Sequence, residues 1–107
     1  MDAVLRAIAE PNRRKILELV RDTELSAGDI ARAFDVSRPA VSQHLKILEQ
    51  AGLLSVRKDG TRRLYRSRPQ AVADVKAFID SYWQEGLDRL KDAAEAQHRR
   101  DKNGRND

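Results

Sequence analysis

Two helical patterns follow each other so closely within residues 26–51 that only a tight turn fits between them. Ser26 is a good N-cap, and Asp29, three residues later, completes a capping box. Ser37 supplies the next N-cap and Gly52 a natural stop, so the second helix is expected from residue 37 or 38 to about residue 51. Two helices joined by so short a turn form a helix-turn-helix unit.

A basic hairpin pattern follows the second of these helices. Residues 53–58 and 61–67 are strand candidates, and Asp59-Gly60 between them is a strong hairpin signal because glycine accepts the positive φ of a tight turn. Residues 57–68 hold one acid among many basic side chains, whereas residues 22–35 hold four acids and one base. A hairpin in this position is a wing. The sequence therefore predicts a winged helix-turn-helix fold, mainly α, with five helices and a two-stranded wing.

Three further helices are expected around this unit. The first two cover residues 2–10 and 11–21, and Pro11 suits the first turn of the second because that position needs no amide hydrogen. The last helix runs from Pro69 to about His98, and the remaining residues, RRDKNGRND, carry no apolar side chain. We expect one folded domain over residues 1–98 and a disordered polar tail over residues 99–107.

Composition excludes several classes of protein. The chain has no cysteine, which removes disulfides and thiolate metal sites and is typical of a reducing interior. No apolar run approaches the roughly 20 residues of a membrane span, so we expect a cytoplasmic protein without a membrane partner. No nucleophile–base pair or glycine-rich phosphate loop has a recognisable spacing. We therefore expect a non-enzymatic protein without a cofactor.

The polar face of the second helix carries side chains suited to reading DNA bases. Gln43 has the donor and acceptor geometry for adenine, Arg38 suits guanine, and Ser42 can serve either. Small residues at the start of this helix allow close approach to base edges, as a recognition helix in a major groove requires. The predicted DNA-binding residues of this helix are Ser37, Arg38, Pro39, Ala40, Ser42, Gln43, His44 and Lys46.

His44 lies beside the apolar stripe of the same helix rather than at the centre of its polar face. The stripe consists of Val41, Leu45 and Leu48, which fall together at about 100° per residue and are expected to be buried. A half-buried histidine that supports the helix through a backbone group or a phosphate is therefore favoured over a base reader or a metal ligand.

The predicted wing contacts to DNA are Arg57, Lys58, Thr61, Arg62 and Arg63. Arginine at a wing tip suits phosphates or a minor groove, whose negative potential attracts it. The alternative is that these basic residues only protect an exposed sheet edge. Arg62 and Arg63 are favoured as DNA contacts more strongly than Arg57 and Lys58. A winged helix can also serve as a protein-interaction module without reading DNA, but such a module has no need of so basic a wing.

Three segments resemble the ArsR-type, or arsenical-repressor-like, winged-helix regulators of bacteria. They are AIAEPNRRKILELV, LSAGDIARAFDVSRPAVSQHLKILEQAGLL and VRKDGTRRLYR, spanning about residues 4 to 66. The resemblance implies a homodimeric transcriptional repressor that pairs through its first and last helices and binds double-stranded DNA. The effector is not indicated by the sequence.

The metal sites that the resemblance implies are absent from this sequence. Ser26-Ala27-Gly28 stands where a thiolate pair begins the third helix in metal-sensing members. A second site, on the last helix, aligns with Glu85, His98 and Asp101, but Leu87 stands where its first histidine belongs. We therefore predict a regulator that does not respond to metal through these sites.

The last helix carries an apolar stripe at alternating three- and four-residue steps. At ~1.5 Å per residue the predicted helix is about 40 Å long, more than so small a core needs, which argues for a partner helix. In a dimer, two recognition helices about 34–36 Å apart read a pseudo-palindromic site. The predicted dimerisation residues are Val4, Leu5, Ile8, Val75, Ile79, Tyr82, Trp83, Leu87 and Leu90.

Overall fold

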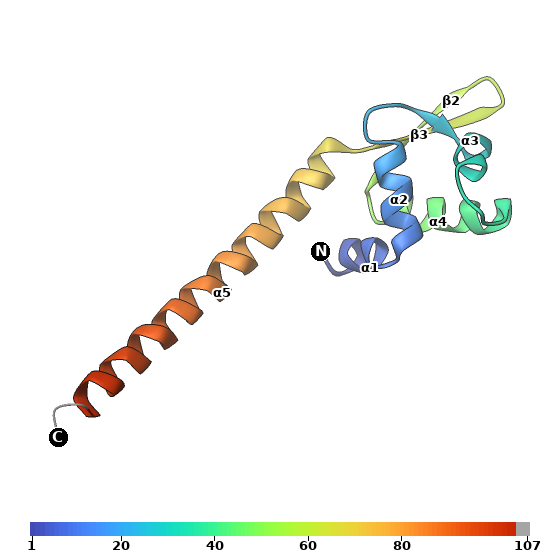
Figure 1. The fold of residues 1–107 in the computed structure, drawn as a ribbon. Helices are drawn as coiled ribbons and strands as arrows, with labels where there is room; N and C mark the ends of the chain where they lie inside the picture. Colours follow the sequence, from blue (N-terminus) through green and yellow to red (C-terminus); the bar gives the residue numbers. More distant parts are fainter. Residues whose placement is uncertain (105–107) are drawn as a thin grey trace. The chain divides into compact units, whose positions relative to one another are not determined.

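The computed structural model describes residues 1–104 of the chain. The chain divides into two compact units. The first is formed by Met1–Val75, and the second begins at Lys76. The first unit holds four helices, a small sheet and the start of a fifth helix, whose remainder forms the second unit (Figure 1). Within the described range, no helix combines the length and the apolar character that a membrane crossing needs.

Four helices build the first unit, and the last three begin at proline or serine signals that the sequence provides. They are α1 (Asp2–Ala9), α2 (Pro11–Leu19), α3 (Ala27–Arg32) and α4 (Arg38–Gln50). The Glu10 carboxylate accepts a hydrogen bond from the amide of Arg13 at 2.9 Å and caps α2. The predicted capping box at the start of α3 is confirmed, as is the Ser37 cap of α4.

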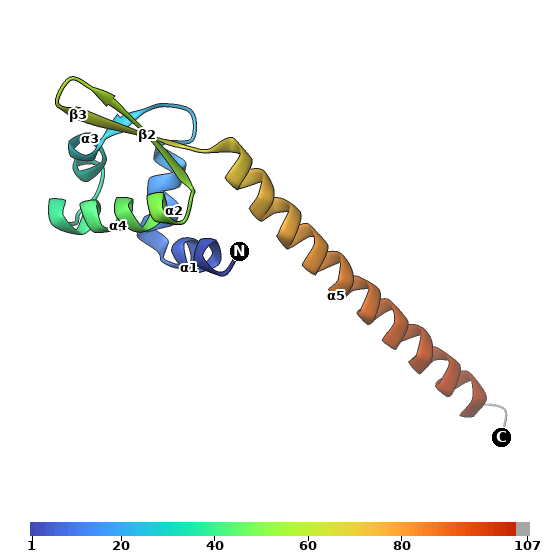
Figure 2. The ribbon, with the colours of Figure 1, turned by 180° about the vertical axis from the view of Figure 1, so that it is seen from behind.

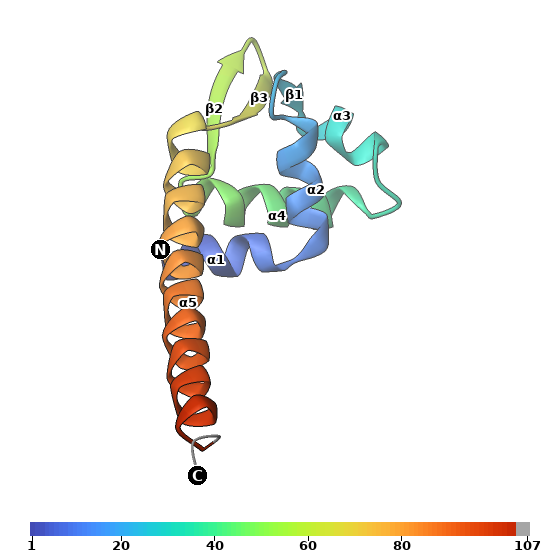
Figure 3. The same ribbon diagram turned by 60° about the vertical axis from the view of Figure 1, so that its left-hand side comes forward.

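The two-stranded wing expected from the sequence is present, and a short additional strand extends it to a three-stranded antiparallel sheet. Its order is β1 (Leu25–Ser26), β3 (Arg62–Ser67) and β2 (Leu54–Asp59) (Figure 3). β1 pairs with β3 through Leu25 opposite Tyr65, so the segment before α3 joins the wing to the helix-turn-helix unit. The extra strand has only two residues, too few for a pattern that sequence alone can show.

The hairpin turn lies one residue later than the Asp59-Gly60 pattern suggests. Asp59 pairs with Arg62 across the hairpin, so Gly60 and Thr61 form the loop. Gly60 has a φ of 65°, and glycine with positive φ at the first loop position is the arrangement of a type II′ turn. Gly52, with a φ of 79°, likewise follows the end of α4 as expected.

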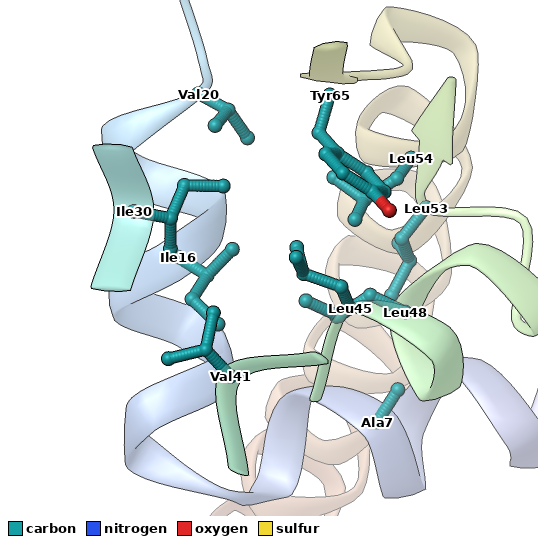
Figure 4. Close-up of a cluster of buried hydrophobic side chains, with 10 residues drawn as sticks. All are labelled: Ala7, Ile16, Val20, Ile30, Val41, Leu45, Leu48, Leu53, Leu54 and Tyr65. Atoms are coloured by element: carbon teal, nitrogen blue, oxygen red, sulfur yellow. The ribbon is translucent and has the colours of Figure 1, made fainter. Parts of the chain in front are cut away.

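The core of the first unit lies between the helices and the sheet. Figure 4 shows its ten side chains pointing toward one another from α1, α2, α3, α4, β2, β3 and the segments that follow α2 and α4. Val41, Leu45 and Leu48 of α4 are buried, so this part of the sequence prediction is confirmed. The core residues are Ala7, Ile16, Val20, Ile30, Val41, Leu45, Leu48, Leu53, Leu54 and Tyr65.

The end of β3 is hydrogen-bonded to α2 and the residue that follows it. The buried Ser67 donates its hydroxyl to the carbonyl of Leu17 at 3.3 Å, and its amide donates to the carbonyl of Val20 at 3.0 Å. These bonds satisfy polar groups that would otherwise be buried at a cost. They also connect the wing to the helical core, and the rear view in Figure 2 shows the hairpin above α2 and α4.

Helix α5 (Pro69–Gly104) is longer than the sequence predicts. Its end was expected near His98, with a disordered tail from residue 99, but residues 99–104 are helical, and residues 105–107 lie outside the described range. Gln97 donates to Asp101 Oδ1 at 3.0 Å, and Arg100 donates to Gln97 Oε1 at 2.7 Å. Side-chain pairs one turn apart stabilise a helix, so a purely polar sequence can continue one.

The predicted dimerisation residues fall into two groups by exposure. Val4, Leu5, Ile8 and Val75 are half-buried within the first unit. The others, on α5, are exposed in a single copy of the chain, with Tyr82 at 72%, Trp83 at 65% and Leu90 at 68% of full exposure. Ile79 and Leu87 are also exposed, as is Phe78, which the sequence analysis did not single out.

Candidate nucleic-acid interface

Helix α4 turns its polar face to the surface. Ser42, Gln43 and Lys46 are exposed between buried positions of the apolar stripe, and Ser37, Arg38 and Pro39 are exposed where the helix begins, with Ala40 half-buried. The Ser37 hydroxyl accepts a hydrogen bond from the amide of Ala40 at 3.3 Å and is therefore engaged in capping. The side chains predicted to read bases are thus accessible to a partner of the chain.

His44 lies at the border between the polar face of α4 and the core, as its position on the helical wheel suggests. Its side chain is 18% exposed, and its Nδ1 lies 3.5 Å from Arg13 Nη1 and 3.9 Å from Glu10 Oε2. Arg13 also donates to the backbone carbonyls of Ala7 and Arg6 in α1. His44 is therefore tied to the α1–α2 junction, which supports a role in positioning α4.

The Arg38 side chain extends from α4 toward α3, unlike the other side chains predicted to read bases. Its guanidinium lies against Gly28 in α3, where an added Cβ would stand 3.4 Å from Nη1 and 3.7 Å from Cζ. The helical-wheel analysis places Arg38 near the base readers because a wheel shows where a side chain starts. It does not show toward which neighbouring element a long side chain extends.

Three wing arginines are paired with carboxylates of the helical part. Arg57 Nε lies 3.0 Å from Glu24, Arg62 Nη2 lies 3.2 Å from Asp29, and Arg63 Nη2 lies 3.3 Å from Glu49. The three acids come from the loop before β1, from α3 and from α4. The sequence pattern predicts the arginines as DNA contacts but not these partners, since the pairs join residues 14 to 33 positions apart. Lys58 and Thr61 are exposed at the wing tip.

A groove of about 660 Å³ runs between α4 and the wing. It is lined by Ser42, Lys46, Glu49 and Gln50 from α4 and by Arg63 and Tyr65 from β3. The exposed face of the helix and the basic strand therefore border the same hollow. A second cleft, of about 850 Å³, lies between α3, the first residue of α4 and the wing.

Asp29 joins α3 to the wing. Its carboxylate accepts hydrogen bonds from Arg32, from Arg62 and from the backbone amide of Ser26. Hydrogen bonds from Arg32 and Ser26 hold the pKa of the Asp29 carboxyl below its usual range. The charged form is therefore favoured by the folded state.

Replacing Asp29 with asparagine is expected to lower the free energy of unfolding at pH 7 but not in acid. A carboxyl whose folded pKa is depressed stabilises the fold above its unfolded pKa, and this contribution is lost as the pH falls through the folded value, below about 3.9. Urea unfolding of both proteins at pH 7 and pH 3 measures this. Asp35→Asn, at an exposed acid in the turn before α4, is the control. An equal difference between wild type and Asp29→Asn at both pH values would contradict the linkage.

The part of the chain that the structure describes contains no cluster of side chains that could form a metal site. No group of three or more histidine, aspartate or glutamate side chains stands close enough there to hold an ion. Asp101, which aligns with a metal-binding carboxylate, accepts a hydrogen bond from Gln97. The whole sequence contains no cysteine, so the thiolate site of metal-sensing relatives has no ligands here.

A helix-turn-helix unit with an exposed polar second helix, followed by a basic hairpin, defines the class of winged-helix DNA-binding proteins. The profile of the bacterial regulatory proteins of the arsR family matches residues 10–56, from the residue before α2 into β2. HTH-type transcriptional regulator Rv2034 of Mycobacterium tuberculosis is 42% identical over 86 residues, 80% of either chain. Transcriptional repressor SdpR of Bacillus subtilis is 47% identical over 74 residues, 69% of this chain and 82% of that one.

A solved structure shows the same fold. The homodimeric winged helix-turn-helix DNA-binding domain of Mb0332 from Mycobacterium bovis has a TM-score of 0.64 and 31% identity, covering 78% of each chain. The present chain belongs to the arsR family of bacterial regulatory proteins. It is a DNA-binding transcriptional regulator and not an enzyme, and the predicted fold class and family are confirmed.

Proposed function

We propose that the protein is a homodimeric repressor that binds a pseudo-palindromic operator and does not respond to metal through the sites known in its family. The observation that carries this proposal is the groove between α4 and β3. Ser42 and Lys46 of the helix and Arg63 of the wing border the same hollow, so one duplex can engage both elements. A helix in the major groove and a basic wing on the flanking backbone require this arrangement.

Base reading falls to Gln43 and Ser42 in this proposal. Both are exposed on α4 next to positions that point into the core, which fixes the direction of the helix face. Gln43 can form paired hydrogen bonds with adenine N6 and N7, and Ser42 can donate or accept. Lys46, Lys58 and the wing arginines supply charge for phosphates, and His44 holds the helix in place through Arg13 and Glu10.

A second copy of the chain is the proposed partner of α5. The helix has 36 residues, about 54 Å at 1.5 Å per residue, and its large apolar side chains are exposed in one copy. Apolar side chains at three- and four-residue steps are typical of helices that pair with another helix. The structure of the Mb0332 domain is homodimeric, which supports the same assembly here.

Repression without metal sensing is the regulatory part of the proposal. SdpR, with 47% identity, is named a transcriptional repressor, and a bound dimer over a promoter excludes other proteins from the same DNA. The absence of cysteine removes thiolate sensing. A bacterial regulator of this family acts where the DNA lies, so we place it in the cytoplasm.

Selection of bound duplexes from a random library by the purified protein tests the proposal. The enriched sequences are expected to form an inverted repeat whose half-sites lie one helical turn, about 10 base pairs, apart. The selection is repeated with a chelator and with added zinc, and the same repeat is expected in each case. Recovery of no common sequence would contradict sequence-specific binding. Recovery of the repeat in only one of the two conditions, chelator or added zinc, would contradict metal independence.

Replacing Gln43 with alanine is expected to relax the preference at one base position of each half-site. The lost pair of hydrogen bonds corresponds to about 1–3 kcal/mol per half-site for the preferred base, and little for the others. Titration of the selected duplex and its single-base variants measures the effect. Gln70→Ala, at an exposed glutamine on α5, is the control and should leave all affinities unchanged. A uniform loss across all duplexes with Gln43→Ala would rule out base reading by this residue.

A further inference from the structure

Arginine residues from three elements line the cleft between α3 and the wing. They are Arg32 of α3, Arg38 at the start of α4, and Arg62 and Arg63 of β3. The cleft measures about 850 Å³, and Asp29 is the one carboxylate in its lining. A hollow with this composition attracts an anion.

Most of these positive charges already have partners within the protein. Asp29 accepts hydrogen bonds from both Arg32 and Arg62, and Glu49 pairs with Arg63 from outside the cleft. Arg38 forms no ion pair with a carboxylate among the residues up to Asp101, whose side chains the structure describes. Arg32 and Arg62 therefore share one negative charge, and Arg38 is the arginine of this lining that has no carboxylate partner among the described side chains.

The Arg38 side chain extends to Gly28 of α3. The guanidinium lies against the glycine, with Nη1, Cζ and Nη2 at 3.4, 3.7 and 3.8 Å from the place of an added Cβ. Arg38 consequently lines the cleft beside α3, and it is absent from the lining of the groove that Ser42 and Lys46 border. In this position Arg38 is separated from the side chains proposed to read bases.

We propose that the cleft binds a phosphate group through Arg38, with Arg62 as a second donor, and that this phosphate belongs to the DNA backbone. The proposal rests on the DNA-binding function proposed above and assigns Arg38 to the backbone rather than to guanine. A planar guanidinium donates two parallel hydrogen bonds to a phosphate, and its charge persists throughout the physiological pH range. Arg62 exchanges its hydrogen bond to Asp29 for the phosphate, at little cost because the Arg62 side chain is exposed to solvent.

Three variants distinguish a backbone contact from a base contact. Affinities for the selected duplex and for scrambled duplexes are measured at several salt concentrations with Arg38→Ala, Arg38→Lys and Gln43→Ala. Arg38→Ala is expected to weaken binding to every sequence by the same factor and to reduce the slope of log affinity against log salt by about 0.9 per protomer. With this change in slope, the affinity of Arg38→Ala relative to wild type is about eightfold lower per protomer at 0.1 M salt than at 1 M salt.

The other two variants serve as references. Arg38→Lys keeps the charge and is expected to keep the salt slope, with weaker binding because the fork of donors is lost. Gln43→Ala is expected to change the preferred base and leave the slope as it is. If Arg38→Ala relaxes one base position with the slope unchanged, Arg38 is a base reader and the proposal is overturned. An unchanged affinity for all duplexes overturns it as well.

The anion bound in the cleft could also be a free phosphate ion instead of a phosphate of the DNA backbone. Inorganic phosphate is the probe for this alternative. Titration of DNA-free protein with phosphate is followed through the backbone amide signals of Gly28 and Arg38. A saturable shift that disappears in Arg38→Ala, together with an unaltered salt slope on DNA, would assign the cleft to a free ion and overturn the DNA assignment. If the wild type prefers no sequence, the proposed function fails, yet the slope change on non-specific DNA still tests the role of Arg38.

Discussion

Replacing Trp83 with glutamate is expected to convert the protein into a monomer and to weaken operator binding by about 10²–10⁴-fold. Trp83 is 65% exposed in one copy, so the first unit does not depend on it, whereas the proposed dimer buries it. A carboxylate in an apolar interface without a partner is costly. The loss of affinity follows because two linked half-site contacts become independent ones.

The measurement combines sedimentation at micromolar concentration with titration of the selected duplex. Ser81→Glu is the matched control, because it adds the same charge to α5 roughly opposite the apolar stripe. Circular dichroism establishes that α5 remains helical in both variants. A Trp83→Glu protein that stays dimeric and binds the duplex as wild type would show that α5 does not hold the dimer together through this stripe.

Replacing Leu45 with alanine is expected to lower the free energy of unfolding by about 2–5 kcal/mol. Leu45 is 1% exposed and faces the core from α4, so the change leaves a cavity beside this helix. In a domain of this size each kcal/mol lowers Tm by about 4–8 °C. A large part of the stability of a small domain is therefore lost.

Thermal and urea unfolding measure this effect. Lys46→Ala, one residue further along the same helix but on its exposed face, is the control and should change stability by no more than about 0.5 kcal/mol. At low temperature, where both variants are folded, Lys46→Ala should weaken DNA binding more than Leu45→Ala. Equal stabilities of the two variants would contradict the assignment of faces on α4.

The helices and the wing were predictable because their signals are local. Ser26 and Ser37 cap the helices that follow them, and the buried stripe of α4 is visible at a spacing of three and four residues. The features that the sequence did not predict, β1 and the position of the hairpin turn, depend on contacts between distant residues. β1 exists because Leu25 pairs with Tyr65, and the turn shifts by one residue because Asp59 pairs with Arg62. Propensity and periodicity carry no information about such pairs.

The candidate site was predictable as a set of residues but not as an arrangement. A helical wheel correctly exposes Ser42 and Gln43 and places His44 at the border. It does not show that Arg38 extends to Gly28, nor that Arg63 pairs with Glu49, since both depend on how neighbouring elements pack. These contacts separate the proposed base readers from the proposed phosphate contact.

The affinity ratio between the selected inverted repeat and a scrambled duplex of equal length tests the central claim most directly. It is measured by fluorescence anisotropy at physiological salt, with the wild-type protein. Sequence-specific binding by a dimer predicts a preference of about 10³-fold or more, and intermediate affinity for a duplex with one half-site. Equal affinities for the three duplexes would contradict the proposal that this protein reads an operator.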